Sequence, residues 1–127
     1  MTKTEKQIVG RIGEDIAKKF LEKKGFTVVG TNVLRKWGEI DLVAEKEGVV
    51  RFVEVKTQSV HTNGSREIGE YRPEEMAHRA KLEKVARTAS LYMEEKGDDR
   101  EYQIDVVAVL LDHGKRIARC RHYEQVL

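Results

Sequence analysis

The sequence is poor in cysteine, proline and tryptophan, with one of each among 127 residues. The lone Cys120 excludes a disulfide within the chain and fits a reducing compartment. No stretch approaches the roughly 18 apolar residues that a membrane span needs, and the first twenty residues hold no apolar run like that of a signal peptide. We therefore expect a soluble, cytoplasmic protein that does not contact a membrane.

Neither sign of charge dominates the chain. Its 24 basic and 22 acidic residues leave a net charge of +2, which neither requires nor excludes nucleic-acid binding. The apolar fraction of 39% is too high for a disordered chain. A chain of this length fits one domain, so we expect residues 1–127 to form a single domain.

Two segments have helical periodicity. In residues 5–24 apolar side chains recur at spacings of three and four, and Gly25 follows two lysines, as is typical of a helix end. The second helix is predicted to begin at Pro73, where proline is tolerated, and to end at Gly97. The single proline leaves both segments free of helix-breaking residues.

Strand-like segments fill much of the remaining chain. Short apolar or alternating runs predict strands at residues 26–30, 40–45, 49–56 and 102–111, with an edge-like strand or irregular tail at 115–123. Residues 32–37 are predicted to form a polar and basic link, and residues 57–72 a long loop. The order predicts a mixed α/β fold in which helices flank a central mixed β-sheet.

Three charged residues interrupt the apolar pattern of the predicted hairpin at residues 40–56. Glu54 and Lys56 are two positions apart, so a strand points both to one face. Asp41 lies opposite Val53 if the turn spans residues 46–48, and opposite Glu54 if it spans 46–49. The sequence leaves both registers open.

The second register would place two carboxylates side by side. Two such groups repel, and a divalent cation that binds both removes this cost. Carboxylate oxygens are the ligands that Mg²⁺ or Mn²⁺ prefers, and Lys56 would add positive charge beside an attacked phosphate. A simpler alternative also remains open, in which Glu54 and Lys56 form a solvent-exposed ion pair without catalytic function.

Three blocks of sequence carry a resemblance to a known family. The segments GRIGEDIAKKFLEKKGF, NVLRKWGEIDLVA and VRFVEVKT resemble the YraN family of small bacterial proteins over roughly residues 7–93. That family is similar to Holliday-junction resolvases and has the restriction-endonuclease-like PD-(D/E)XK nuclease fold. The resemblance therefore implies this fold, a Mg²⁺ or Mn²⁺ cofactor, and DNA, in particular branched DNA, as the substrate.

The resemblance also assigns site residues. Asp41 matches the motif aspartate and Glu54 with Lys56 matches E-x-K, which implies that Asp41, Glu54 and the Val55 carbonyl hold the metal. Glu14 matches the acidic residue of the first helix that borders such sites, and Glu39 would have a supporting role.

Candidate DNA contacts come from basic and polar residues around this set. They are Arg11, Arg35, Lys36, Gln58 and Lys81, each of which has a solvated surface position as its alternative. Thr57 and Gln58 follow the E-x-K motif where the family often has an arginine, so the contacts with substrate are expected to differ there. The single Trp37 is predicted to be a core residue, with a base-stacking surface as the alternative.

Three functions are compatible with these residues. The first is a metal-dependent DNA endonuclease acting on branched DNA in repair or recombination; because a resolvase cuts two symmetric strands, it would act as a homodimer. The second is a non-catalytic nucleic-acid-binding module of the same fold. The third is a protein-interaction adaptor that uses the long loop and the charged helices.

Overall fold

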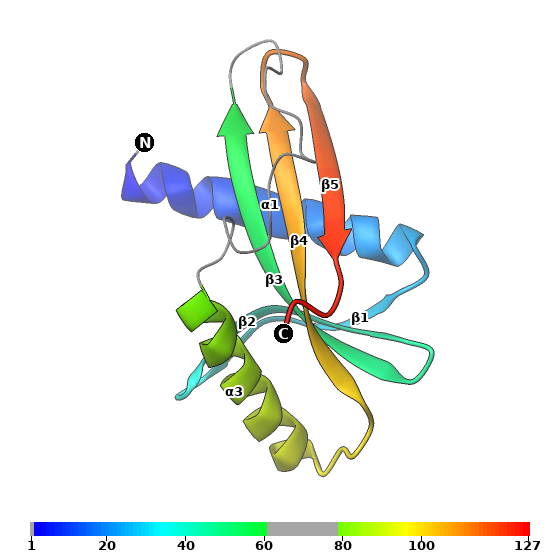
Figure 1. The fold of residues 1–127 in the computed structure, drawn as a ribbon. Helices are drawn as coiled ribbons and strands as arrows, with labels where there is room; N and C mark the ends of the chain where they lie inside the picture. The colour runs from blue at the N-terminus through cyan, green and yellow to red at the C-terminus, as the bar shows by residue number, and fades with distance from the viewer. Residues whose placement is uncertain (1, 61–78) are drawn as a thin grey trace.

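The computed structural model describes residues 2–60 and 79–127, which form one mixed five-stranded sheet with a helix on each face (Figure 1). The elements in chain order are α1 (Lys3–Lys23), β1 (Thr27–Arg35), β2 (Gly38–Lys46), β3 (Val49–Val60), α3 (Arg79–Lys96), β4 (Tyr102–Asp112) and β5 (Ile117–Tyr123). The architecture is the mixed α/β fold expected from the sequence and is consistent with a restriction-endonuclease-like fold.

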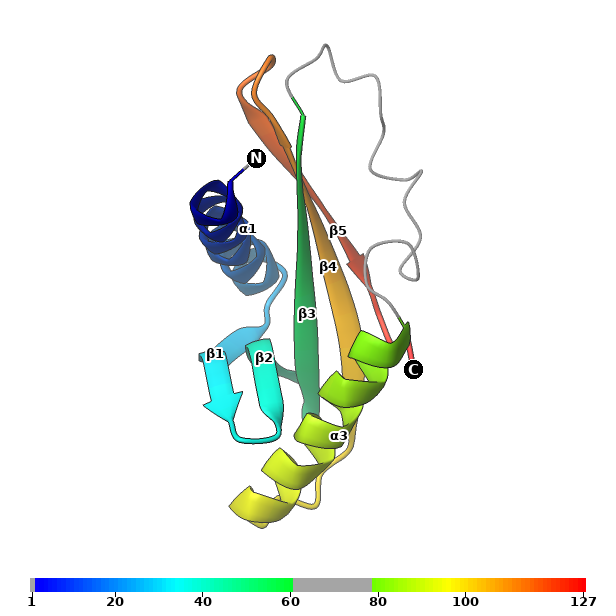
Figure 2. The ribbon, with the colours of Figure 1, turned by 90° about the vertical axis from the view of Figure 1, so that its left-hand side faces the viewer.

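The sheet has the strand order β1-β2-β3-β4-β5. Only β3 and β4 are parallel, and the other neighbours pair antiparallel. Figure 2 shows α1 and α3 on opposite sides of the central strands. Strands β2, β3 and β4 are therefore covered on both faces, which explains their nearly continuous apolar sequences.

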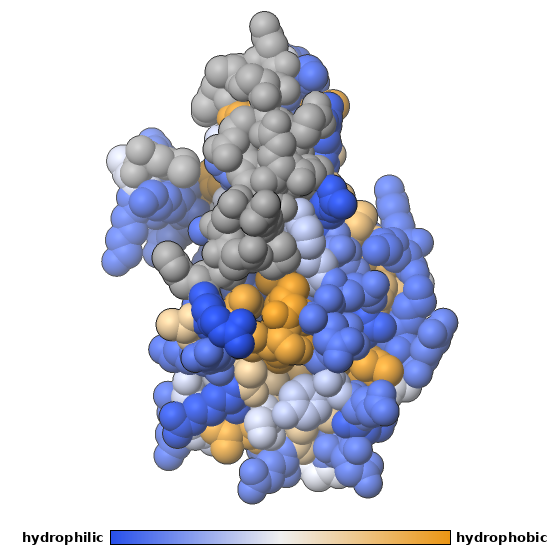
Figure 3. All heavy atoms as spheres, in the orientation of Figure 1, coloured by the Kyte–Doolittle hydropathy of each residue, from blue (hydrophilic) through white to orange (hydrophobic). Residues whose placement is uncertain are grey.

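Each helix covers its own apolar cluster. The cluster beneath α3 contains Phe52 and Val106, whereas the cluster beneath α1 contains Val53 and Val107. Adjacent residues of one strand thus serve opposite faces, as the two-residue period of a strand requires. On the α3 side, hydrophilic residues lie to the left and right of a small apolar area of the surface (Figure 3).

Most predicted elements are present, with shifted ends. Helix α1 begins at Lys3 because Thr2 and Glu5 form a capping box, and the strand predicted at 115–123 is β5, at the edge of the sheet. The predicted link at 32–37 is wrong, since β1 continues to Arg35. Residues 57–60, assigned to the loop, belong to β3, and the rest of that loop and Pro73 lie outside the described residues.

Neither described helix is long and apolar enough to cross a membrane. Trp37, predicted as a core residue, is half-buried in the turn between β1 and β2.

Candidate functional site

The hairpin of β2 and β3 fixes the register that the sequence left open. Lys46 pairs with Val49, so the turn consists of Glu47 and Gly48, both with positive φ (53° and 79°). This is the backbone shape that two-residue hairpin turns favour. The ladder runs to the pair Leu42 and Val53. Continued by one residue, this register sets Asp41 opposite Glu54, whose charge acts on Asp41.

Strand β2 is irregular at Asp41. Ile40 and Val43 both pack beneath α3, although residues three apart in a regular strand face opposite sides. Leu42 faces α1, so the alternation is broken between Ile40 and Leu42. At this break the Asp41 Oδ2 atom accepts a hydrogen bond of 2.9 Å from the backbone N–H of Val55.

The two carboxylates lie in a desolvated setting. Burial and the charge of Glu54 raise the pKa of Asp41 to about 7, and the Val55 hydrogen bond offsets only part of this rise. Glu54 is only 3% exposed. Its Oε1 atom lies 2.6 Å from the Nζ atom of Lys81, in the first turn of α3. A half-buried and a buried carboxylate, Asp41 and Glu54, thus lie together with one ammonium group nearby.

A glycine lets α1 bring a third carboxylate to the pair. Gly13 lies against β3, and a Cβ atom added there would overlap the Thr57 hydroxyl and lie 2.8 Å from the Thr57 Cβ atom. Glu14 follows directly in sequence. Burial and the charge of Asp41 raise the pKa of Glu14, and its carboxyl group lies within hydrogen-bonding reach of Asp41. The proximity of Glu14 to Asp41 agrees with the role that the resemblance implied.

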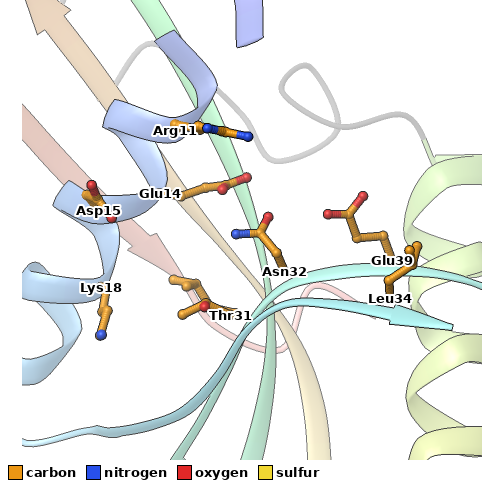
Figure 4. A pocket seen from close by; sticks show the side chains of 9 residues that line it. Arg11, Glu14, Asp15, Lys18, Thr31, Asn32, Leu34 and Glu39 are labelled. Carbon is orange, nitrogen blue, oxygen red and sulfur yellow. The ribbon is translucent and has the colours of Figure 1, made fainter. Parts of the chain in front are cut away.

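A polar cleft opens beside this group, between α1 and the neighbouring ends of β1 and β2 (Figure 4). Its volume is about 550 Å³, and Arg11, Glu14, Asn32 and Glu39 lie on its walls. With its amide nitrogen turned toward them, Asn32 lies 3.1 Å from Glu14 Oε1 and 3.2 Å from Glu39 Oε1. Asn32 was missed as a site residue, although asparagine is uncommon inside strands.

Lys56 and Gln58 continue the row that Glu54 begins on β3. Alternation places all three on the face that α3 partly covers. Lys56 is exposed, and within residues 2–60 and 79–127 no carboxylate forms an ion pair with its ammonium group. Lys56 is therefore available to a ligand beside Glu54, whereas Gln58 is half-buried.

The other proposed DNA contacts occupy different places. Arg11 shares the cleft wall with Glu14, and Lys36 is exposed in the turn between β1 and β2. Arg35 forms an ion pair of 2.8 Å with Glu95 and lies over the Tyr92 ring. Glu95 is in the last turn of α3, roughly 20 Å along the helix from Lys81. Arg35 is thus engaged away from the carboxylates.

A second acidic group lies on the α1 face of the sheet. Asp105, His122 and Glu124 place one potential metal ligand each within 4.8 Å of one another. The sequence suggested no ligand role for His122. However, Arg51 Nη1 lies 3.3 Å from Asp105 and 2.7 Å from Glu124, so a guanidinium group already pairs with both carboxylates of this cluster.

Comparison with known proteins assigns the family. The model of the uncharacterised protein family UPF0102 matches residues 13–109. The chain belongs to UPF0102. This is the YraN group that the sequence blocks resembled, and the matched segment spans Gly13, most of the cleft-lining residues, and all of β2, β3 and α3.

UPF0102 proteins of three bacteria illustrate the likeness. The chain is 38% identical to one from Campylobacter jejuni over 104 residues, covering 81% of this chain and 84% of the relative. It is 36% identical to one from Alkaliphilus metalliredigens over 110 residues, covering 86% and 90%. It is 31% identical to one from Flavobacterium psychrophilum over 116 residues, covering 91% and 90%.

Proposed function

We propose that this UPF0102 protein is a divalent-metal-dependent endonuclease that hydrolyses phosphodiester bonds in branched or otherwise structured DNA. The observation that carries the proposal is the pairing of Asp41 with the buried Glu54 at the irregular point of β2. Burial and mutual repulsion make this pair unfavourable when both groups are ionised. A site that retains such a pair favours binding of a cation.

The residues fit Mg²⁺ or Mn²⁺. Both metals prefer carboxylate and carbonyl oxygens, and the ammonium group of Lys81 already occupies the position of a counter-cation beside Glu54. Asp41, Glu54 and the Val55 carbonyl would hold the metal. The N–H and C=O of a strand residue point to the same side, so this carbonyl shares the side of the N–H that binds Asp41. When bound, the metal supplies Lewis-acid activation of water and neutralises phosphate charge.

The chain's own residues supply the remaining chemistry. Lys56, exposed beside Glu54, would orient the attacking water and stabilise negative charge that develops on the phosphate. Arg11 on the cleft wall and Lys81 would hold neighbouring phosphates, while Glu14 borders the carboxylate pair from α1. These contacts position a backbone without reading its sequence, which suits a substrate recognised by its structure.

A cleavage assay tests the proposal directly. Wild type, Asp41→Asn/Glu54→Gln and the exposed control Asp99→Asn would be incubated with four-way junction, flap and linear duplex DNA, each with Mg²⁺, Mn²⁺ or EDTA. We expect metal-dependent cutting by wild type and Asp99→Asn, with at least a roughly hundredfold loss in the double variant. Cutting that survives in the double variant would refute the assigned site.

Binding without cutting has a different meaning. If wild type binds the junction but cuts no substrate with either metal, the protein is the non-catalytic binding module of the same fold. The proposal includes a cytoplasmic location. It also includes a homodimer, because paired cuts require two active sites. Light scattering of the protein bound to a junction measures the number of protein chains per junction.

A further inference from the structure

Asn32 has a backbone conformation that is uncommon inside a strand. Its φ is 47°, in the left-handed region that asparagine tolerates better than most residues. Its neighbours Thr31 and Val33 pair with Leu42 and Ile40, so Asn32 faces Asp41 across the ladder. The left-handed residue of β1 therefore lies opposite the residue at which the alternation of β2 is broken.

The amide of Asn32 connects two elements that do not follow each other in the chain. With its amide nitrogen turned toward them, Asn32 donates to Glu14 of α1 at 3.1 Å and to Glu39 of β2 at 3.2 Å. An asparagine amide carries two N–H donors, which matches two carboxylate acceptors. Figure 4 shows Asn32 between these two residues at the cleft.

The neutrality of the amide matters for a cation site. Glu14 and Glu39 are both acidic and repel each other. A lysine or arginine would relieve that repulsion but would also neutralise the site and compete with a metal ion for the carboxylates. An amide holds both carboxylates by hydrogen bonds and leaves their negative charge in place.

We propose that Asn32 is a positioning residue whose amide ties Glu14 to the end of β2 and so holds the Glu14 carboxylate beside the Asp41–Glu54 pair. The inference rests on the proposed metal-dependent function. It adds that the metal affinity depends on a residue that does not itself bind the metal.

Replacement by glycine separates this role from a structural one. Asn32→Gly removes the amide and keeps a residue that adopts positive φ freely. The matched control is Gln125→Gly, because Gln125 is also neutral, exposed and at positive φ (49°). We expect both variants to unfold within a few degrees of wild type, since glycine fits both positions. Isothermal titration with Mn²⁺ should give about tenfold weaker binding for Asn32→Gly, as for other residues that orient ligands, and no change for Gln125→Gly.

A double-mutant cycle tests whether Asn32 acts through Glu14. In a Glu14→Gln background, Asn32→Gly should weaken Mn²⁺ binding less than about twofold, because the carboxylate that it positions is gone. Equal Mn²⁺ affinity of wild type and Asn32→Gly, or a tenfold loss that persists in the Glu14→Gln background, overturns the inference but leaves the proposed function standing. A wild-type protein that binds no Mn²⁺ overturns both.

Discussion

Two aspartates of the same sheet, the buried Asp105 and the half-buried Asp41, differ in their surroundings. Asp105 accepts hydrogen bonds from His122, Gln103 and the Gln125 backbone, and Arg51 lies beside it. Burial raises the pKa of Asp105, but these donors outweigh it and the pKa is lowered. Burial also raises the pKa of Asp41, but there the neighbouring charge of Glu54 adds to the rise.

The difference separates a structural carboxylate from the one that we propose binds a metal. Asp105 has donors that stabilise its ionised form, so the folded protein satisfies its charge without a ligand. Asp41 has one backbone donor and a carboxylate neighbour, so its charge is stabilised only in part. Burial alone does not identify a site; the balance of donors and like charges does.

The largest expected effect concerns Asp105. Asp105→Ala leaves Arg51 and His122 without their buried partner, and we expect a loss of about 3–5 kcal/mol in the free energy of unfolding at pH 7. Because the folded-state pKa of Asp105 is lowered, its contribution is present above about pH 4 and is lost as the pH falls through the folded-state pKa. Urea denaturation from pH 3 to pH 7 measures this, and a loss below about 1 kcal/mol at pH 7 would show that Asp105 is not a structural anchor.

Added metal should stabilise the protein through Asp41 and not through the Asp105 cluster. Mn²⁺ at a hundred times its dissociation constant should stabilise wild type by about 2.7 kcal/mol. It should not stabilise Asp41→Asn, whereas a variant of the other cluster, Glu124→Gln, should respond as wild type does. Thermal unfolding with and without Mn²⁺ measures the shift. A response that disappears in Glu124→Gln instead would place the metal at the Asp105 cluster.

Ionisation of Asp41 should lower the free energy of unfolding of the metal-free protein. Since its pKa is about 7 in the folded protein and about 4 when unfolded, the folded state binds the proton more tightly, and stability falls as pH rises through this window. Asp41→Asn removes that fall, and we expect it to be about 1–2 kcal/mol more stable than wild type at pH 8 without metal. Equal pH dependence of both proteins between pH 4 and pH 8 would contradict the assignment.

The smallest effect concerns the ammonium group beside Glu54. Lys81→Met removes a competitor for the carboxylate and should strengthen Mn²⁺ binding about threefold, since the lysine side chain is 60% exposed and such pairs contribute little. Lys84→Met, also exposed in the first half of α3, serves as the control. Titration calorimetry measures both, and weaker binding in Lys81→Met would mean that Lys81 organises Glu54 rather than competing with the metal.

Local pattern narrows the register of Asp41 and Glu54 to two alternatives. The alternation of β2 and β3 and the short turn between them depend on nearby residues, so the sequence places Asp41 and Glu54 within one residue of their observed register. Asn32 falls in a predicted link because asparagine is typical of turns. The left-handed backbone conformation of Asn32 inside β1 is not predicted by any local pattern.

Contacts between distant elements are out of reach of the sequence. The pairing of Lys81 with Glu54 depends on where the first turn of α3 meets the sheet, and the pairing of Arg35 with Glu95 on where its last turn lies. From the sequence, both Lys81 and Arg35 are candidate DNA contacts with a solvated surface position as the alternative, and neither ion pair is predicted. The proximity of Glu14 likewise depends on the close approach of Gly13 to Thr57, and was available only through resemblance.

The pairing pattern of β3 also bears on the order in which the chain folds. Its partner β2 is joined to it by a two-residue turn, whereas its parallel partner β4 begins pairing at Val50 and Tyr102, far apart in the sequence. Short loops close quickly and long ones slowly, so we expect the β2–β3 hairpin to form first, on a timescale of about 1–10 μs. Asp41 and Glu54 would then meet while still hydrated, and their repulsion would grow only when β4 and the helices exclude water.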